Sequence, residues 1–392
     1  MGTMCERGEA AGAASRTIYA AVEVSRKSWV VGLHAPNATG IGVHVIPAAD
    51  VDALAGLFDR ARARLERGEG VPSRVLCGYE AGYEGFWLSR RLADLRVEAV
   101  VLDAASLPVS LRAKRVKTDR VDAARMVRAL MALDRDGPGV CSVVRVPSVE
   151  EEDRRRLPRE RRRLVTQRTR LTNSIKGLLM LHGVFDLDPR SAEFAERLDS
   201  ARTGYRAPLP PGARAEVRRA KALLEVVEGQ IAEVEAERDR IVERARSATA
   251  DQGGADRRPD AMIARLVRLH GVGPNDAVVL AHEVFCREFR NRRQLAGWAG
   301  LAPAPWTSGE ARRVQGIDKS GPPWARAQLV QLAWRWLRHQ PESELSRWFR
   351  ARAGGSEGRV RRVLVIALAR KLLVALWRYA TMGVVPAGAR LA

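Results

Sequence analysis

The spacing of apolar residues changes part-way along this chain of 392 residues, and the change restricts the fold more than any other feature. Between residues 17 and 136, short runs of strand-forming residues are separated by stretches with helical spacing. After residue 157, apolar residues recur mainly at helical intervals. This pattern predicts an α/β domain with a mixed sheet, followed by all-α regions.

Five strands and three helices are expected in the α/β domain. The strand segments are 18–23, 28–34, 41–46, 74–79 and 98–102, and the helical segments are 51–66, 86–95 and 120–133. The first strands follow one another directly, whereas the later strands are separated by helices. A sheet built from both kinds of connection contains antiparallel and parallel pairs.

Composition and periodicity divide the chain into six predicted regions. They are a loose tail at 1–16, the α/β domain at 17–136, a linker at 137–157, a coiled-coil helical region at 158–248, a linker at 249–260 and a helical domain at 261–392. Within the coiled-coil region, two apolar stripes flank a proline-rich loop at 206–212. Such stripes are typical of a coiled coil or of an antiparallel helix pair.

Basic residues exceed acidic residues by 67 to 46, which gives a formal net charge of +21. DNA, RNA and an anionic membrane surface are the candidate partners of such a charge. Only 7 of the basic residues are lysine, and guanidinium groups bind phosphate bidentately, which favours nucleic-acid binding over mere solubility as the role of the charge. A GC-rich genome would also enrich arginine, but it would not create the net charge. No apolar run is long enough to cross a bilayer.

The cysteines indicate a reducing compartment. Cys5, Cys77, Cys141 and Cys286 are too far apart for a paired zinc or disulfide framework. The first sixteen residues have no apolar run and do not form a signal peptide. A cytoplasmic location is therefore expected.

Four acidic residues stand where a site for a hard metal ion needs them. Glu23 and Glu80 end two predicted strands. Asp119 and Asp122 are three residues apart at the start of a predicted helix, which places both on one helical face. Such carboxylates can bind Mg²⁺ or Mn²⁺ and assist phosphoryl transfer. Each acid also has a structural explanation, as a solvated strand end or as a cap at a helix N-terminus.

A segment rich in glycine and proline, residues 300–321, is expected to form a loop between helices. It contains Ser308 before a glycine, and Arg312, Arg313 and Lys319 follow closely. A serine hydroxyl can attack a phosphodiester when it is deprotonated and when cations stabilise the pentavalent phosphorus. A serine in a loop is more commonly a turn residue, and Ser320 is a second candidate of the same kind.

Three further features have both nucleic-acid-binding and structural interpretations. Gly271 and Gly273 lie in a turn whose backbone N–H groups can contact a phosphate, or that joins packed helices. Residues 154–163 hold seven arginines and one glutamate, which is typical of a track for a nucleic-acid backbone or of a solvated helical face. Tryptophans among the basic residues of 334–352 are expected in the core rather than stacked on bases.

The acidic and serine patterns together resemble the DEDD transposases, a family of insertion-sequence recombinases. The resemblance covers about residues 18–383, and its most specific piece is the segment Lys-Thr-Asp-x-x-Asp-Ala that begins at Lys117. It implies a RuvC/RNase H-like domain whose four acids bind the metal, and a helical transposase domain in which Ser308 is the nucleophile. Glu23 replaces the family's usual Asp, and Pro322 replaces the expected Asn.

The resemblance also implies partners, an assembly and a nucleoid-associated location in a bacterial cytoplasm. A covalent phosphoserine link would join the protein to DNA, and a guide RNA encoded by the element would pair with that DNA. The coiled coil would assemble a dimer or a tetramer, and Lys117 would contact nucleic acid. Two other classes stay open: a metal-dependent RuvC-like nuclease without serine chemistry, and an inactive nucleic-acid-binding remnant.

Overall fold

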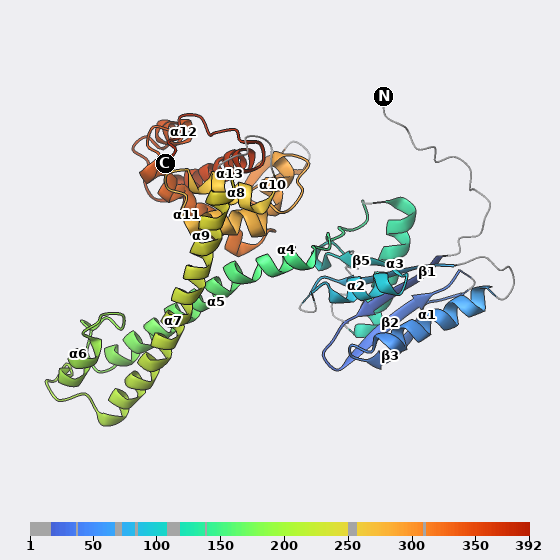
Figure 1. The fold of residues 1–392 in the computed structure, drawn as a ribbon, viewed down its shortest axis with the longest axis horizontal. Coiled ribbons are helices and arrows are strands. Elements are labelled where there is room, and N and C mark those ends of the chain that lie inside the picture. Colours follow the sequence, from blue (N-terminus) through green and yellow to red (C-terminus); the bar gives the residue numbers. More distant parts are fainter. Residues whose placement is uncertain are drawn as a thin grey trace. The chain divides into compact units, whose positions relative to one another are not determined.

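The computed structural model describes residues 17–36, 38–66, 73–82, 85–107, 118–137, 139–249, 257–308 and 311–392. The chain divides into two compact units, Met1–Ser148 and Val149–Ala392. Figure 1 shows a sheet with its helices in the first unit, and a long helix pair joined to a helical core in the second.

A five-stranded mixed sheet, with the order β3-β2-β1-β4-β5, forms the centre of the first unit. Its strands are β1 (Thr17–Glu23), β2 (Ser28–His34), β3 (Gly42–Pro47), β4 (Arg74–Glu80) and β5 (Glu98–Leu102). The first three strands pair antiparallel, whereas β4 pairs parallel with β1 and β5 pairs parallel with β4. The mixed sheet expected from the connections is confirmed.

Helices cover both faces of this sheet. They are α1 (Val51–Glu66), α2 (Trp87–Asp94) and α3 (Asp119–Asp136), with a short 3₁₀ turn, η1 (Ala104–Ser106), after β5. In β1, Ala20 belongs to the apolar cluster that contains α1 and α2, whereas Ala21 belongs to the cluster that contains α3. Successive strand residues point to opposite faces, so α3 covers one face and the other two helices cover the opposite one.

The predicted elements of the α/β domain are confirmed, with ends shifted by at most three residues. The tail at 1–16 lies outside the described residues. The linker predicted at 137–157 is helical in its second half, because α4 (Val149–Arg154) begins there and is followed directly by the next helix.

The second unit begins with an antiparallel helix pair. The pair consists of α5 (Arg156–Met180) and α7 (Pro211–Thr249), with the short α6 (Phe194–Ser200) between them. Leu164 shares a buried cluster with Ile231, whereas Ile175, farther along α5, shares one with Leu224, which lies earlier in α7. The two apolar stripes of the sequence therefore meet along a seam within one chain.

Six helices and a π-helical turn surround the core of the second unit. They are α8 (Pro259–Val267), α9 (Pro274–Val279), the π-helical η3 (Leu280–Val284), α10 (Arg292–Trp298), α11 (Pro323–His339), α12 (Glu344–Ala353) and α13 (Gly358–Met382). α13 packs on α8, α10, α11 and α12, and its residues Leu368, Leu372 and Leu376 are fully buried. The helical character predicted for this region is confirmed for these segments.

The loop predicted at 300–321 is wrong in its middle. Residues there form a hairpin of two antiparallel strands, β6 (Pro303–Ser308) and β7 (Ala311–Ile317), with an irregular register between Pro303 and Pro305. Prolines are tolerated in such a ribbon because an edge strand leaves half of its N–H groups unpaired. No third strand pairs with this ribbon among the residues that the structure describes, so neither of its faces has to be apolar throughout and the sequence shows no clear alternation.

Within the described part of the chain, no helix is both long and apolar enough to span a bilayer. Cys77, Cys141 and Cys286 form no disulfide, and Cys5 lies outside the described residues. Burial raises the pKa of the Cys77 thiol to about 12, which keeps this group protonated at neutral pH.

Candidate active site

Glu23 and Glu80 lie at the same edge of the sheet. β1 and β4 are parallel neighbours with Val22 opposite Tyr79, and the next residue of each strand is the glutamate. Open α/β sheets bind ligands at the carboxyl ends of their strands. The edge predicted to hold two of the four acids is therefore present, with both glutamates half-buried.

Two glycines let α3 approach the sheet closely. A Cβ added to Gly32 in β2 would lie 3.1 Å from the carbonyl oxygen of Ala123. A Cβ added to Gly78 in β4 would lie only 2.7 Å from the side chain of Leu130. Because both positions lack a side chain, the helix lies directly on the backbone of two strands.

The first turn of α3 carries both predicted aspartates. Thr118, and not Asp119, is the N-cap residue, because its hydroxyl oxygen accepts a hydrogen bond of 3.3 Å from the Val121 N–H. Asp119 is exposed, whereas Asp122 is only 5% exposed. A buried carboxylate needs a cation or hydrogen-bond donors, so Asp122 must have a partner inside the fold.

Arg125 supplies a cation between two of the four acids. Its Nη2 lies 3.1 Å from Oδ1 of Asp122 and 3.5 Å from Oε1 of Glu80. A strand end and a helix thus contribute carboxylates that meet at one guanidinium nitrogen. Arg125 was not predicted as a site residue, although its spacing of three residues from Asp122 places it on the same helical face.

The four acids fit a hard cation in chemistry but are not gathered around one point. Their donor atoms are all carboxylate oxygens, which Mg²⁺ and Mn²⁺ prefer. Among the described residues, no three His, Cys, Asp or Glu side chains form a ready metal site. Glu80 and Asp122 share the guanidinium of Arg125, so a side chain balances the charge of these two acids in this structure.

Ser308 is the last residue of β6 and pairs with Ala311 across the hairpin. Arg312 and Arg313 stand on the partner strand, opposite Thr307 and Trp306. The side chains of residues 306–315 and all of Lys117 lie outside the described part of the structure, so the contacts predicted for them stay predictions.

The base of this hairpin is a tight contact between two backbones. A Cβ on Gly321 would lie 2.5 Å from the Gly300 nitrogen and would overlap the carbonyl oxygen of Trp298. Gly300 itself has a φ of +62°, a conformation that favours glycine. Beside them, the Asp318 N–H donates to the carbonyl oxygen of Ala302 at 2.8 Å. The hairpin therefore leaves the helical core through a junction that admits only glycine.

Residues 319–322, which follow the hairpin, include three that were singled out from the sequence. Lys319 is exposed and has a left-handed backbone, with a φ of +64°. The Ser320 hydroxyl donates to Oδ2 of Asp318 at 2.7 Å. Pro322 is the N-cap residue of α11, where the first N–H groups of a helix have no acceptor within it. The proline that departs from the family pattern is thus compatible with this fold.

The glycine turn before α9 packs against α11. A Cβ on Gly271, whose φ is +86°, would lie 2.9 Å from Cβ of His339. The Gly273 N–H donates to Asp276, a carboxylate that is 1% exposed and pairs with Arg335 at 2.6 Å. These contacts give both glycines a packing role. The phosphate contacts predicted for them stay predictions.

A buried ion network at η3 escaped the sequence analysis. The Glu283 carboxylate, with a side chain only 2% exposed, pairs with Arg159 at 3.0 Å and with Arg162 at 3.2 Å. Arg162 also lies 4.4 Å from the ring centre of Trp324. Part of the arginine track of α5 therefore attaches this helix to the core, and no local pattern around Glu283 indicates it.

The tryptophans of the carboxy-terminal region are split between core and surface. Trp336 is fully buried, as the core interpretation predicts, and its indole N–H donates to Ser343 at 2.9 Å. Trp334 is 37% exposed, and the guanidinium of Arg361 lies 5.6 Å from its ring centre.

Comparison with known proteins identifies the relatives of this chain. Residues 263–346 match the family model described as transposase IS116/IS110/IS902 family. A Sinorhizobium fredii protein named as transposase y4rJ is 43% identical over 376 residues, which cover 95% of this chain and 94% of the relative. The chain belongs to the IS116/IS110/IS902 transposase family.

More distant relatives carry the same kind of name. A Pseudomonas aeruginosa protein named as a family 20 transposase is 32% identical over 237 residues, which cover 60% of this transposase and 65% of the relative. The match at 263–346 includes the glycine turn, η3 and the β6–β7 hairpin. Because transposases act on DNA, DNA is a partner of this protein.

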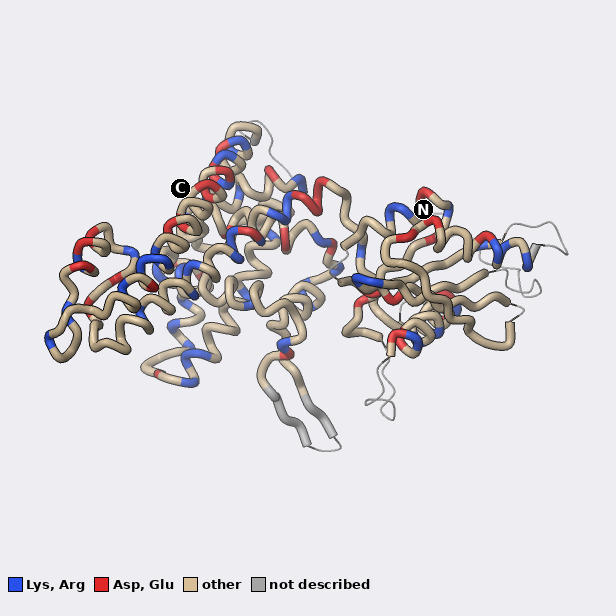
Figure 2. The backbone as a smooth tube through the Cα atoms, turned by 90° about the horizontal axis from the view of Figure 1, so that it is seen from below, with Lys and Arg blue, Asp and Glu red and all other residues tan. Residues whose placement is uncertain are grey.

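The charge on the helix pair of the transposase is asymmetric. Basic and acidic residues are interspersed over both units (Figure 2). α5 nevertheless carries eight basic residues and one acidic residue, whereas α7 carries eight of each. Arg163 and Arg170 of α5 are both exposed and, at a spacing of seven, lie on one helical face. Of the two helices of the pair, α5 is therefore the better candidate for contact with a DNA backbone.

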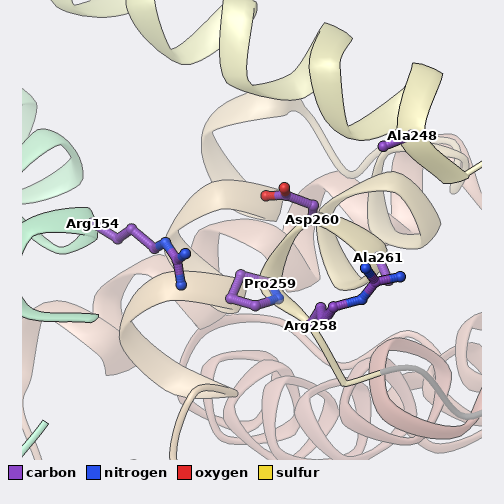
Figure 3. A pocket seen from close by; sticks show the side chains of 6 residues that line it. All are labelled: Arg154, Ala248, Arg258, Pro259, Asp260 and Ala261. Carbon is purple, nitrogen blue, oxygen red and sulfur yellow. The ribbon is translucent and has the colours of Figure 1, made fainter. Parts of the chain in front are cut away.

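A polar pocket of about 210 Å³ lies beside the N-terminus of α8 (Figure 3). Its lining residues are Arg154, Ala248, Arg258, Pro259, Asp260 and Ala261. Because the wall carries both signs of charge, it favours neither a phosphate nor a metal ion. Of the residues singled out from the sequence, only Arg154, the first of the arginine track at 154–163, lines it.

Proposed function

We propose that this transposase cuts and rejoins DNA through a covalent phosphoserine intermediate. Ser308 is the nucleophile, and Glu23, Glu80, Asp119 and Asp122 bind Mg²⁺ or Mn²⁺. The observation that supports this most strongly lies at the carboxyl edge of the sheet, where Glu80 and the buried Asp122 both contact the guanidinium of Arg125. Such an arrangement suits phosphoryl transfer, in which charge develops on oxygen.

The first unit is proposed to be a RuvC-like domain. Its strand order β3-β2-β1-β4-β5, with three antiparallel strands followed by two parallel ones, supports this assignment. The helix that carries the two aspartates lies directly on the central strands. The acids then come from two strand ends and one helix, as the resemblance implies.

In the proposed reaction the Ser308 hydroxyl loses its proton, and its oxygen bonds to phosphorus. The bond from phosphorus to one deoxyribose oxygen breaks, and that oxygen takes up a proton. Attack by another deoxyribose hydroxyl reverses these steps, releases the serine and joins new strands, so no external energy source is needed. A bound divalent ion would supply Lewis-acid stabilisation of the charged oxygens. The exposed arginines of α5 bind and orient the DNA backbone.

A guide RNA and an oligomer complete the proposal. The net charge of +21 supports binding of a second polyanion beside DNA. The outer face of α7 leaves Leu223 and Val226 both 60% exposed, which supports dimers or tetramers formed through a coiled coil of helix pairs.

Strand cleavage of an element-end DNA, with guide RNA present, tests the proposed function. Wild-type protein with Mg²⁺ should cut the strand and remain attached to it, whereas Ser308→Ala and Asp122→Asn should each reduce cutting at least a hundredfold. Free cut ends produced by Ser308→Ala at the wild-type rate would indicate a nuclease without serine chemistry. No cutting by any form would indicate an inactive remnant.

A further inference from the structure

We propose that Arg125 is a resident cation of the acidic site, which neutralises Glu80 and Asp122 before a divalent ion arrives and then competes with that ion. This inference rests on the proposed function, because it takes these acids to be metal ligands. Arg125 is a positioning residue in this account, since it acts through the two carboxylates.

The first argument is geometric. A single guanidinium nitrogen, Nη2, contacts both carboxylates, at 3.1 Å and 3.5 Å. A divalent ion held by Glu80 and Asp122 would lie close to this guanidinium, and two cations so near one another repel unless one of them moves away. The arginine and the metal ion are therefore alternatives at this point.

The second argument is the incomplete hydrogen bonding of the arginine. Its Nε is buried and has no hydrogen-bond partner among the described residues. A guanidinium that served only structure would be expected to satisfy this donor, because leaving a buried polar group unpaired is unfavourable. In Arg125 the Nε–H has no acceptor within the described part of the chain, while Nη2 lies between the two carboxylates.

The third argument is that this arginine can withdraw while its helix stays in place. Its neighbours Ala123 and Met126 are fully buried, so α3 is fixed against the sheet. The Arg125 side chain itself is 30% exposed and has a long, flexible stem. Side-chain rotation can thus move the guanidinium toward solvent without moving Asp122.

Direct binding of Mn²⁺ to the full-length protein, followed by the electron paramagnetic resonance signal of the free ion, tests the inference. The informative variant is Arg125→Met, which keeps the stem and removes the charge. Arg128→Met is the matched control, because it removes the same charge from an exposed position one turn along α3. We expect at least about tenfold tighter Mn²⁺ binding for Arg125→Met and less than about twofold change for Arg128→Met.

Two further variants make each outcome decisive. Arg125→Lys, which keeps the charge, should bind Mn²⁺ within about threefold of wild type. Arg125→Gln provides a second uncharged form in case Arg125→Met does not fold. If uncharged variants bind Mn²⁺ no more tightly than wild type, while Asp122→Asn abolishes binding, the competition is refuted and the metal site stands. If no form binds Mn²⁺, or if binding survives Asp122→Asn, the metal assignment of the proposed function fails instead.

Discussion

Substitution of Gly321 by alanine should damage the hairpin that carries Ser308. The added Cβ would overlap the Trp298 carbonyl oxygen and lie 2.5 Å from the Gly300 nitrogen and 2.7 Å from the Ala299 carbonyl carbon. All three atoms are backbone, so no flexible side chain can move aside. Overpacking of this kind costs about 3 kcal/mol of unfolding free energy. For a unit of this size, that lowers the melting temperature by about 6 to 12 °C.

Calorimetry of the full-length protein, with strand cleavage measured beside it, checks this expectation. The matched control is Gly297→Ala in α10, where an added Cβ meets nothing within 4 Å, and a small gain in stability of about 0.5 kcal/mol is expected. Because the distortion lies at the root of the hairpin, cleavage by Gly321→Ala should fall more than the folded fraction does. A melting temperature unchanged from wild type, with full cleavage, would refute the view that this junction admits only glycine.

Two further expectations concern charge. Replacing Arg163 and Arg170 on α5 by glutamate should reduce the slope of log affinity for DNA against log salt concentration by about 2, the value for two lost phosphate contacts. The same change at Arg219 and Arg240 on α7, where basic and acidic residues balance, should alter that slope by less than about 0.5. Equal effects of the two pairs would contradict a specific DNA-binding surface on α5. Burial lowers the pKa of His282 to about 4, so the unfolded chain takes up a proton before the folded chain does as the pH falls below about 6.5. Between those two pH values this histidine lowers the free energy of unfolding by an amount on the order of 3 kcal/mol. Chemical denaturation at pH 7 and pH 4.5 should therefore show a smaller loss of unfolding free energy for His282→Gln than for wild type, and equal losses would contradict this expectation.

The elements of the first unit were predictable because each has its own local pattern. Strand residues of β1 are apolar on both faces, and α1 repeats Leu54, Leu57 and Phe58 at helical spacing. The carboxyl edge followed from these elements, since Glu23 and Glu80 end parallel neighbours. The burial of Asp122 was not predictable from local sequence, because it depends on Gly32 and Gly78 in separate strands letting α3 approach closely.

The second unit was less predictable because its special features depend on distant residues. Glu283 is buried only because Arg159 and Arg162, more than a hundred residues earlier, neutralise it. In the described part of the chain the hairpin of Ser308 pairs with no further strand, so its backbone pairing creates no alternating apolar pattern. Arg125 was overlooked because an arginine in a helix is ordinary in a chain with a net charge of +21.

The most direct measurement of the central claim is identification of the residue that becomes attached to DNA. The covalent complex formed on an element-end substrate is digested, and the peptide that retains a nucleotide is sequenced by mass spectrometry. The account predicts a phosphodiester on Ser308, absent from Ser308→Ala and strongly reduced in Asp122→Asn. Attachment at Ser320 or at any other side chain would contradict it.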